Sequence, residues 1–440
     1  MSGAALHSAP WVVPIASPPL RDGALLVGAD GRIAAVGRRG ELRAAHRDVP
    51  ERRWEGTLLP GLVNAHTHLQ YSDLDALGAV SYVGFEAWCA AFDARYPQVS
   101  GAQAWGDAAR RGLELSLRAG VTCFGDVVTD DGARGVLAAA GVAGVAFLET
   151  LGEDEAGWAG GGRERFLARL DGASGRSGEE GPAREAGTQL AGGDVAALGI
   201  SPHAPYSVDT AVIADLGRIA RARGLRLHAH LAESQLEHEL VLAGSGRLAA
   251  LVREWGWSLA LLERGGAGVS PARYLDETLA LGPDCHVAHG VALDAADRAL
   301  LRERGTAVAL CLRSNLTIGV EPPPLAAYLE EGSPLCVGTD SLASAPSLDL
   351  LGELPPLRAR AREQGYRRDD LDARLLAAAT AGGAAALGLA GTVGALLPGA
   401  RADLALLAVT PERGEPIERA VVERGAGSCV ATLVRGVVRG

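Results

Sequence analysis

Two pairs of histidines stand at the ends of short apolar runs and could bind a metal ion. His66 and His68 follow the run PGLVNA, and His228 and His230 end the run LRLHAH. Side chains two residues apart on an extended chain point the same way, so the imidazoles of one pair can reach one ion. Imidazole is a ligand suited to zinc, iron and nickel. Buried imidazoles without such a partner would leave polar atoms unsatisfied, so the sequence predicts a metal site at His66 and His68.

A carboxylate follows the second pair at close range. Glu233 comes three residues after His230, where it can reach a water on the ion and relay its proton. Its alternative role is that of a first-turn helix residue favoured by the helix dipole. The spacing indicates His230 as the metal ligand and His228 as a structural or supporting residue.

Two further polar residues end apolar runs later in the chain. Asp340 ends LCVGTD, and a buried aspartate is unfavourable unless it is paired or bound to metal. It could instead cap a helix, but nearby serines can do that, which leaves Asp340 free to bind the ion. His289 ends CHVAH and could polarise a nucleophilic water or a developing oxyanion. A core histidine is the alternative for His289, and His286 fits that structural role better.

The elements that carry these residues alternate between strand-like and helical patterns. The strand-like runs are nearly continuous in apolar residues, as parallel strands covered on both faces are. Eight of them separated by helical stretches indicate an α/β protein with a (β/α)₈ TIM barrel, whose strand ends meet at one face. An open, doubly wound sheet is the alternative. The expected strands span residues 60–66, 121–126, 143–149, 198–203, 225–230, 285–289, 307–312 and 335–340.

The two chain ends differ from the middle of the sequence, because they contain short β-like runs and few helical patterns. We expect residues 1–59 and 393–440 to form one small β-sandwich domain, with the barrel of residues 60–392 inserted between them. Gly28–Gly31 is a hairpin signal inside the first of these segments. The stretch 155–195 is rich in glycine, serine and charge and is expected to be a surface loop before the fourth barrel strand.

Composition excludes several classes of function. The formal net charge is −11, which disfavours nucleic-acid binding. No apolar run reaches the roughly 18 residues of a membrane span, and the N-terminus lacks a signal-peptide pattern. The six cysteines form no C-x-x-C pair, as in a cytoplasmic protein with reduced thiols.

The chain has no lysine, which excludes catalysis through a Schiff-base lysine, a P-loop lysine or a carbamylated lysine that bridges two metals. A Rossmann oxidoreductase is disfavoured because no G-x-G-x-x-G follows a first strand.

Five segments in order give the chain a family resemblance: PGLVNAHTHL, SPHAPYS, HLAES, the strand end at His289 and GTDS. Together they resemble the amidohydrolase superfamily, in its branch of cytosine-, guanine- and adenosine-type deaminases and triazine hydrolases. PGARADLALL, which begins at residue 398, also resembles that branch. The resemblance implies one divalent ion, zinc first with iron or manganese as alternatives, held by His66, His68, His230 and Asp340. It also implies a substrate pocket lined by Trp88, His203, Ser314 and Asn315.

The resemblance further implies a mechanism. Glu233 would take a proton from the attacking water and pass it to the ring nitrogen, His289 would hold that water, and Glu233 or Asp340 would protonate the leaving ammonia. Such an ion lowers the pKa of its water from about 15.7 toward 7. Dimers are frequent in this branch, so a homodimer is one expected assembly of the cytoplasmic enzyme.

Within the branch, the chain most resembles the aminodeoxyfutalosine deaminases of menaquinone biosynthesis, which act on the adenine of a modified nucleoside. The fragments that carry this likeness begin at residues 243, 270, 311 and 339: AGSG, SPARYLD, CLRSN and TDSLAS. Two departures are Gln98, near where relatives carry a ribose-binding carboxylate, and Leu312, where many have proline. Alternatives are deamination of S-adenosylhomocysteine, methylthioadenosine or guanine, dechlorination of a triazine, and a barrel that binds a small molecule without turnover.

Overall fold

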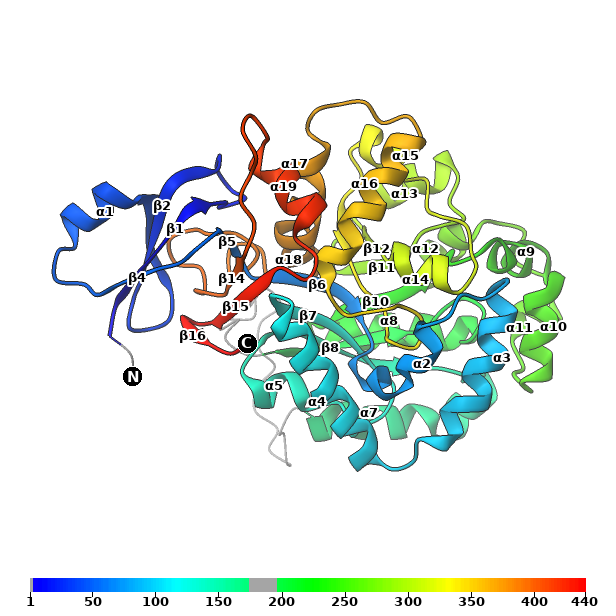
Figure 1. Ribbon diagram of the computed structural model, residues 1–440. Coiled ribbons are helices and arrows are strands. Elements are labelled where there is room, and N and C mark those ends of the chain that lie inside the picture. Colours follow the sequence, from blue (N-terminus) through cyan, green and yellow to red (C-terminus); the bar gives the residue numbers. More distant parts are fainter. Residues whose placement is uncertain (1–2, 174–195) are drawn as a thin grey trace.

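The computed structural model describes residues 3–173 and 196–440, and its larger part is a barrel of eight parallel strands (Figure 1). The strands pair in sequence order, and a parallel bridge between Thr67 and Asp340 joins the two ends of the sheet. The expected (β/α)₈ barrel is therefore confirmed. Its strands are β6 (Leu62–Thr67), β7 (Val121–Val128), β8 (Ala143–Thr150), β9 (Ala197–Pro202), β10 (Arg226–Leu231), β11 (Cys285–His289), β12 (Ala307–Leu310) and β13 (Leu335–Val337).

Helices between the strands cover the barrel with one apolar face each. In α8 (Thr210–Ala222), Val212, Leu216 and Ile219 are buried at spacings of three and four, the repeat of a helix with one face against the core. In α13 (Ala295–Arg304) the side chain of Asp294 accepts from the backbone N–H of Asp297 in a capping box. Among the other covering helices are α4 (Ala102–Arg118), α15 (Leu325–Glu331), α16 (Leu354–Glu363) and α17 (Leu371–Ala377).

Both chain ends contribute to a second sheet, as expected. Its strands pair in the order β16-β15-β14-β5-β1-β2-β3, with β4 on β1, so the C-terminal strands lie beside the N-terminal ones (Figure 1). The expected hairpin turn is present, with the Gly28 N–H donating to the Arg32 carbonyl at 2.8 Å. The strands are β1 (Ala5–Val12), β2 (Leu20–Val27), β3 (Ile33–Arg38), β4 (Glu51–Arg53), β5 (Thr57–Pro60), β14 (Leu404–Leu407), β15 (Cys429–Val434) and β16 (Val437–Val438).

One residue separates this sheet from the barrel. Gly61 stands between β5 and β6, and a Cβ there would lie 2.0 Å from the Thr122 side-chain oxygen. Glycine is therefore needed for the close approach of the chain to β7. A second link is the fully buried Arg401, whose Nε lies 2.9 Å from Asp403 Oδ2 and whose Nη2 donates to the Gly141 carbonyl at 3.3 Å.

The expectation of a surface loop over 155–195 is wrong for its first half. Residues 155–173 form α6 (Glu155–Gly157), a π-helical turn (Trp158–Gly162) and α7 (Arg163–Ala173). The physical reason is burial of Trp158, Phe166 and Leu170 against the barrel, at helical spacings that the glycines between them obscured. The rest of that expectation, 174–195, lies outside the described residues.

No helix among the described residues is long and apolar enough to cross a membrane. All six cysteines are free.

Candidate active site

Closure of the barrel places His66 and Asp340 side by side. The Asp340 N–H donates to the His66 carbonyl at 3.1 Å, and Thr67 Oγ1 donates to the Asp340 carbonyl at 2.9 Å. The Nε2 atoms of His66 and His68 each lie 3.6 Å from Asp340 Oδ1. Gly338 permits this approach, since a Cβ there would be 2.7 Å from the His66 Cβ. The ligand atoms of His66, His68 and Asp340 all lie within 4.8 Å of one another.

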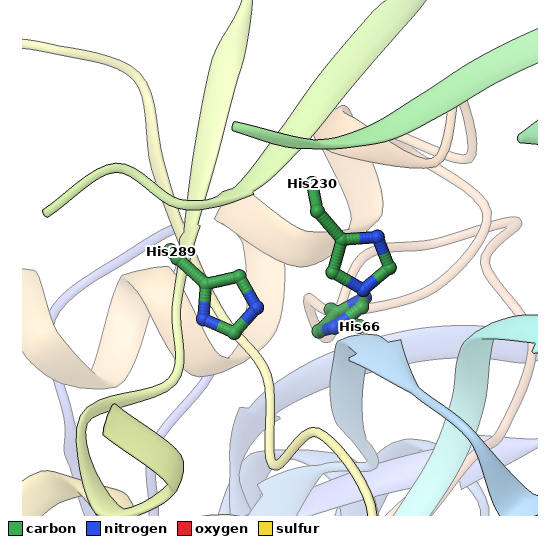
Figure 2. A group of neighbouring side chains, drawn as sticks. All are labelled: His66, His230 and His289. Atoms are coloured by element: carbon green, nitrogen blue, oxygen red, sulfur yellow. The ribbon is translucent and has the colours of Figure 1, made fainter. Parts of the chain in front are cut away.

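The fifth and sixth strands add two imidazoles to the same point. Figure 2 shows His230 and His289 turned toward His66, and their ligand atoms also lie within 4.8 Å of one another. His230 Nδ1 lies 3.1 Å from the His203 carbonyl, which can only accept, so Nδ1 carries the proton and Nε2 offers a lone pair. That Nε2 is 3.3 Å from His68 Nε2. The histidines that the sequence suggests for the site come from segments far apart in the chain, and the fold brings them to one place.

Burial keeps the imidazoles of His66, His68 and His230 neutral, as metal binding requires. Burial lowers the pKa of His66 and holds that of His230 well below its ordinary value, and it lowers the pKa of His68 to about 3. Both ring nitrogens of His66 and Nδ1 of His68 are buried without a hydrogen-bond partner. Such atoms are unfavourable unless something binds them, and neutral imidazoles with one carboxylate form a donor set that fits a divalent ion.

The carboxylate of Asp340 is held on one side only. Ser314 Oγ donates to Asp340 Oδ2 at 2.6 Å and Ser344 Oγ donates to it at 2.9 Å, which leaves Oδ1 facing the histidines. Burial would raise the pKa of Asp340, but the adjacent His66 and the other histidines outweigh it and hold this pKa well below its ordinary value. Ser314 follows Arg313, whose Nε contacts the fully buried Glu353 carboxylate at 2.6 Å. This pair fixes the start of α14 (Leu312–Thr317), the short helix that carries Ser314.

Glu233 lies beside His289, the last member of the histidine group. His289 Nε2 is 3.7 Å from Glu233 Oε1, while Tyr206 donates its hydroxyl to Glu233 Oε2 at 3.2 Å. Burial raises the pKa of Glu233. His289 Nδ1 is 3.1 Å from Asn315 Oδ1, an acceptor, so its proton is on Nδ1 and Nε2 presents a lone pair. Glu237 steadies the segment by accepting from the Glu233 N–H at 3.0 Å.

A cavity of about 370 Å³ opens beside this group. Of the expected substrate-binding residues, Trp88 and His203 line it. Ser314 and Asn315 do not; they are fully buried behind Asp340 and His289. Gln98 is exposed and does not line the cavity either. The lining residues are His68, Tyr71, Phe85, Trp88, Cys89, Phe92, Asp93, Tyr96, Glu149, Leu151, His203, Tyr206, His230, Glu233, Trp255, Trp257, Asp340 and Ser341.

Sequence reasoning missed Glu149, the next-to-last residue of β8, in the wall of this cavity. Its Oε2 accepts from Thr129 Oγ1 at 2.6 Å, and burial raises its pKa to about 7. An acidic residue near the end of an apolar strand is the signal that identified Asp340. The same signal is present in AFLE, residues 146–149. His228 lies behind the site, stacked on His66 with ring centres 4.8 Å apart, in the supporting position expected for it.

Comparison with known proteins agrees with this geometry. Residues 57–438 match the family model described as the amidohydrolase family. The chain is 30% identical to a 5-methylthioadenosine/S-adenosylhomocysteine deaminase of Natronomonas pharaonis over 86% of this chain and 78% of the relative. It is 29% identical to an aminodeoxyfutalosine deaminase of Deinococcus radiodurans over 73% and 72% of the two chains. The structure resembles a crystal structure of an adenosine deaminase from Xanthomonas campestris with bound zinc, with TM-score 0.76 and 24% identity, covering 99% of this chain and 92% of that one.

Proposed function

Because the chain belongs to the amidohydrolase family, we propose that it hydrolyses the amino group from the adenine ring of a modified nucleoside. Aminodeoxyfutalosine is the first candidate substrate, and methylthioadenosine and S-adenosylhomocysteine are the next, since relatives bear these names. The observation that carries the proposal is Glu233, a buried carboxyl 3.7 Å from His289 Nε2 in the wall of a cavity that the histidine group also lines. This arrangement can hold a water and move its proton to a bound ring.

We also propose that His66, His68, His230 and Asp340 hold one divalent ion, with zinc first and iron or manganese as alternatives. The unpartnered nitrogens of His66 and His68 and the orientation of Asp340 Oδ1 toward these two rings support this ligand set. The zinc in the adenosine deaminase of X. campestris supports the choice of metal. When bound, the ion supplies a water that ionises near neutral pH.

Residues of the chain would carry out the remaining steps of the reaction. His289 Nε2 accepts a hydrogen bond from the attacking water, because its Nδ1 proton is committed to Asn315. Glu233 takes a proton from that water and delivers it to the ring nitrogen beside the amino carbon, while Tyr206 holds its other oxygen. The water oxygen bonds to the ring carbon. Glu233 or Asp340 then moves the remaining proton of that oxygen to the amino nitrogen, so the carbon–nitrogen bond breaks and ammonia leaves. The products are a hypoxanthine nucleoside and ammonia.

His203 and Trp88 would hold the substrate in the cavity. His203 Nδ1 lies 2.7 Å from Ser207 Oγ, which fixes the ring beside His230. Trp88 Nε1 donates to the Ala343 carbonyl at 2.9 Å, which fixes the indole beside the Asp340 loop. We propose that Ser314 and Asn315 act through Asp340 and His289 rather than on the substrate.

The test is incubation of the zinc-loaded protein with aminodeoxyfutalosine, methylthioadenosine, S-adenosylhomocysteine, adenosine, guanine and a chlorotriazine. We expect ammonia release and the ultraviolet change from adenine to hypoxanthine with at least one of the adenine nucleosides. Chloride release from the triazine, or ammonia from guanine alone, would replace the proposed substrate class. Binding of a nucleoside to the metal-loaded protein without turnover would favour the non-catalytic barrel.

A further inference from the structure

A second group of possible metal ligands lies in the cavity beside the proposed metal site. Glu149, near the end of β8, and His203, just after β9, are neighbours, and the His203 N–H donates to the Thr150 carbonyl at 3.1 Å. One ligand atom of each lies within 4.8 Å of the other and of a ring nitrogen of His230. Both side chains line the cavity, and neither belongs to the ligand set proposed for the first ion.

Each of these two side chains has an atom suited to bind a cation. Glu149 is almost fully buried, and its Oε1 has no hydrogen-bond partner among the described residues, whereas its Oε2 accepts from Thr129. The Ser207 hydroxyl donates to the Ala204 carbonyl at 3.2 Å, so its oxygen accepts from His203 Nδ1 at 2.7 Å and Nε2 of this ring offers a lone pair. Burial lowers the pKa of His203 to about 3, which keeps the ring neutral. A buried carboxylate oxygen without a partner is unfavourable unless something binds it.

The support of Glu149 is rigid. Arg169 on α7 donates to the Val128 and Thr129 carbonyls at 3.0 and 2.9 Å, and to the Glu149 carbonyl at 2.9 Å. One guanidinium therefore ties the ends of β7 and β8 together. Thr129 Oγ1 also holds Glu149 Oε2 at 2.6 Å. A cation site needs ligands whose positions are fixed in this way by their neighbours.

The carboxyl groups of the cavity can neutralise more than one divalent ion. Those that line it belong to Asp93, Glu149, Glu233 and Asp340. Neither lysine nor arginine is found among the described residues of the lining. When ionised, these carboxyl groups carry twice the charge that the first ion would neutralise. Two-metal enzymes hold divalent ions about 3.5–4 Å apart, so repulsion from the first ion weakens a second site without excluding it.

We propose that Glu149 Oε1 and His203 Nε2 bind a second divalent cation such as zinc, which blocks the substrate cavity. His230 is not a third ligand, because its Nδ1 donates to the His203 carbonyl and its Nε2 belongs to the first site. Water would complete the coordination, and fewer protein ligands make this the weaker site. His203 also holds the substrate in the proposed function, so the second cation and the nucleoside compete for it. Excess zinc should therefore inhibit deamination, and this consequence alone rests on the proposed function.

Calorimetric titration of the one-zinc protein with zinc tests the site directly. We expect a second equivalent that binds more weakly than the first. Glu149→Gln keeps the shape of the side chain and removes its charge, and His203→Ala removes the imidazole. Each should lower the affinity for the second zinc by about tenfold or more, at least about 1.4 kcal/mol. Asp93→Asn is the matched control, because it removes a carboxylate elsewhere in the same cavity, and it should change this affinity by less than about twofold.

Two further measurements accompany the titration. Circular dichroism shows whether each variant is folded. Steady-state kinetics of the unaltered protein measure the competition: zinc beyond one equivalent should raise the KM for methylthioadenosine and leave kcat unchanged. A fall in kcat at constant KM would place the inhibiting ion away from His203 and overturn the assignment.

The outcomes distinguish this inference from the proposed function. Absence of a second equivalent, or a second equivalent that keeps its affinity in Glu149→Gln or in His203→Ala, overturns the inference even if deamination occurs. An equal loss in Asp93→Asn also overturns it, since the cation would then respond only to the overall charge. Loss of the first zinc in a folded variant would assign that residue to the first site and overturn the second. The expected pattern of zinc affinities without ammonia release from any nucleoside supports the second cation site and overturns the proposed reaction.

Discussion

Ser314 Oγ lies 2.6 Å from Asp340 Oδ2, and this hydrogen bond determines which oxygen of Asp340 is free. Ser344 donates to the same Oδ2, so both supporting donors act on one side of the carboxylate. The other oxygen faces His66 and His68 at 3.6 Å. Two serines, one on the short helix α14 and one in the turn after Asp340, therefore hold the aspartate in the orientation that metal binding would need.

The first prediction concerns this support. Ser314→Ala removes one of the two donors, so Asp340 should rotate more freely and zinc affinity should fall by about 10- to 100-fold. Competition for zinc with a chelating dye measures the change. Ser314→Thr keeps the hydroxyl and should retain affinity to within a few-fold. Unchanged affinity in Ser314→Ala would show that Ser344 alone suffices.

The second prediction concerns Glu233. Glu233→Gln keeps the shape and the Tyr206 contact but cannot accept a proton, so kcat should fall by about 10²- to 10⁴-fold. Zinc content, measured by atomic emission, should stay at one ion per chain, because Glu233 is not among the proposed ligands. A variant that keeps both its zinc and its turnover would remove Glu233 from the mechanism.

The third prediction concerns metal removal. An ion that binds only the folded protein adds about 4 kcal/mol to the free energy of unfolding at a concentration 1,000-fold above its Kd. Dialysis against a chelator should therefore lower the melting temperature, and zinc should restore it. His66→Ala should abolish the response to zinc, whereas His238→Ala, on helix α9 (Gln235–Ala243), should keep it. A zinc response that survives in His66→Ala would place the ion elsewhere.

The fourth prediction concerns acid stability of the small sheet. Burial, with a smaller contribution from the Arg52 charge, lowers the pKa of His7 from 6.5 to about 4. Trp54 Nε1 donates to its Nδ1 at 3.1 Å, which requires the neutral ring. The unfolded chain binds this proton first as pH falls, so stability should decrease between pH 6.5 and 4 by up to about 3 kcal/mol.

Urea unfolding at several pH values measures that slope. His7→Gln cannot titrate in this range, and its amide oxygen can accept the Trp54 hydrogen bond. The slope of its unfolding free energy between pH 6.5 and 4 should be shallower than that of the unaltered protein. Parallel slopes would mean that His7 does not contribute to the acid response.

The strand ends could be predicted from sequence because two independent patterns coincide there. An apolar run of about six residues marks a covered strand, and a histidine or aspartate at its end has no place in a core without a partner. The expected run 285–289 has the bounds of β11. The boundaries proposed for the domains, at residues 59/60 and 392/393, stay predictions.

The cavity wall could not be predicted in the same way. Trp255 and Trp257 follow a helix far from every motif, and only the folded chain brings Trp255 to Asp93. The backbone conformation of two site residues could not be predicted from the sequence either. His289 and Asp340 have φ of 74° and 58°, a left-handed conformation that non-glycine residues seldom adopt. Nothing in their local sequence signals it, and such strain persists only where surrounding contacts enforce it.

The single glycine between β5 and β6 has a practical consequence for anyone who wishes to dissect the enzyme. A fragment that starts at the barrel would lack β5, the strand that runs directly into β6, which carries His66 and ends one residue before His68. Its first barrel strand would then lose the connection that holds its N-terminal end, although that strand and the residue after it position two of the four proposed ligands. The small sheet would therefore hold the proposed metal ligands in place, and catalysis should not survive its deletion.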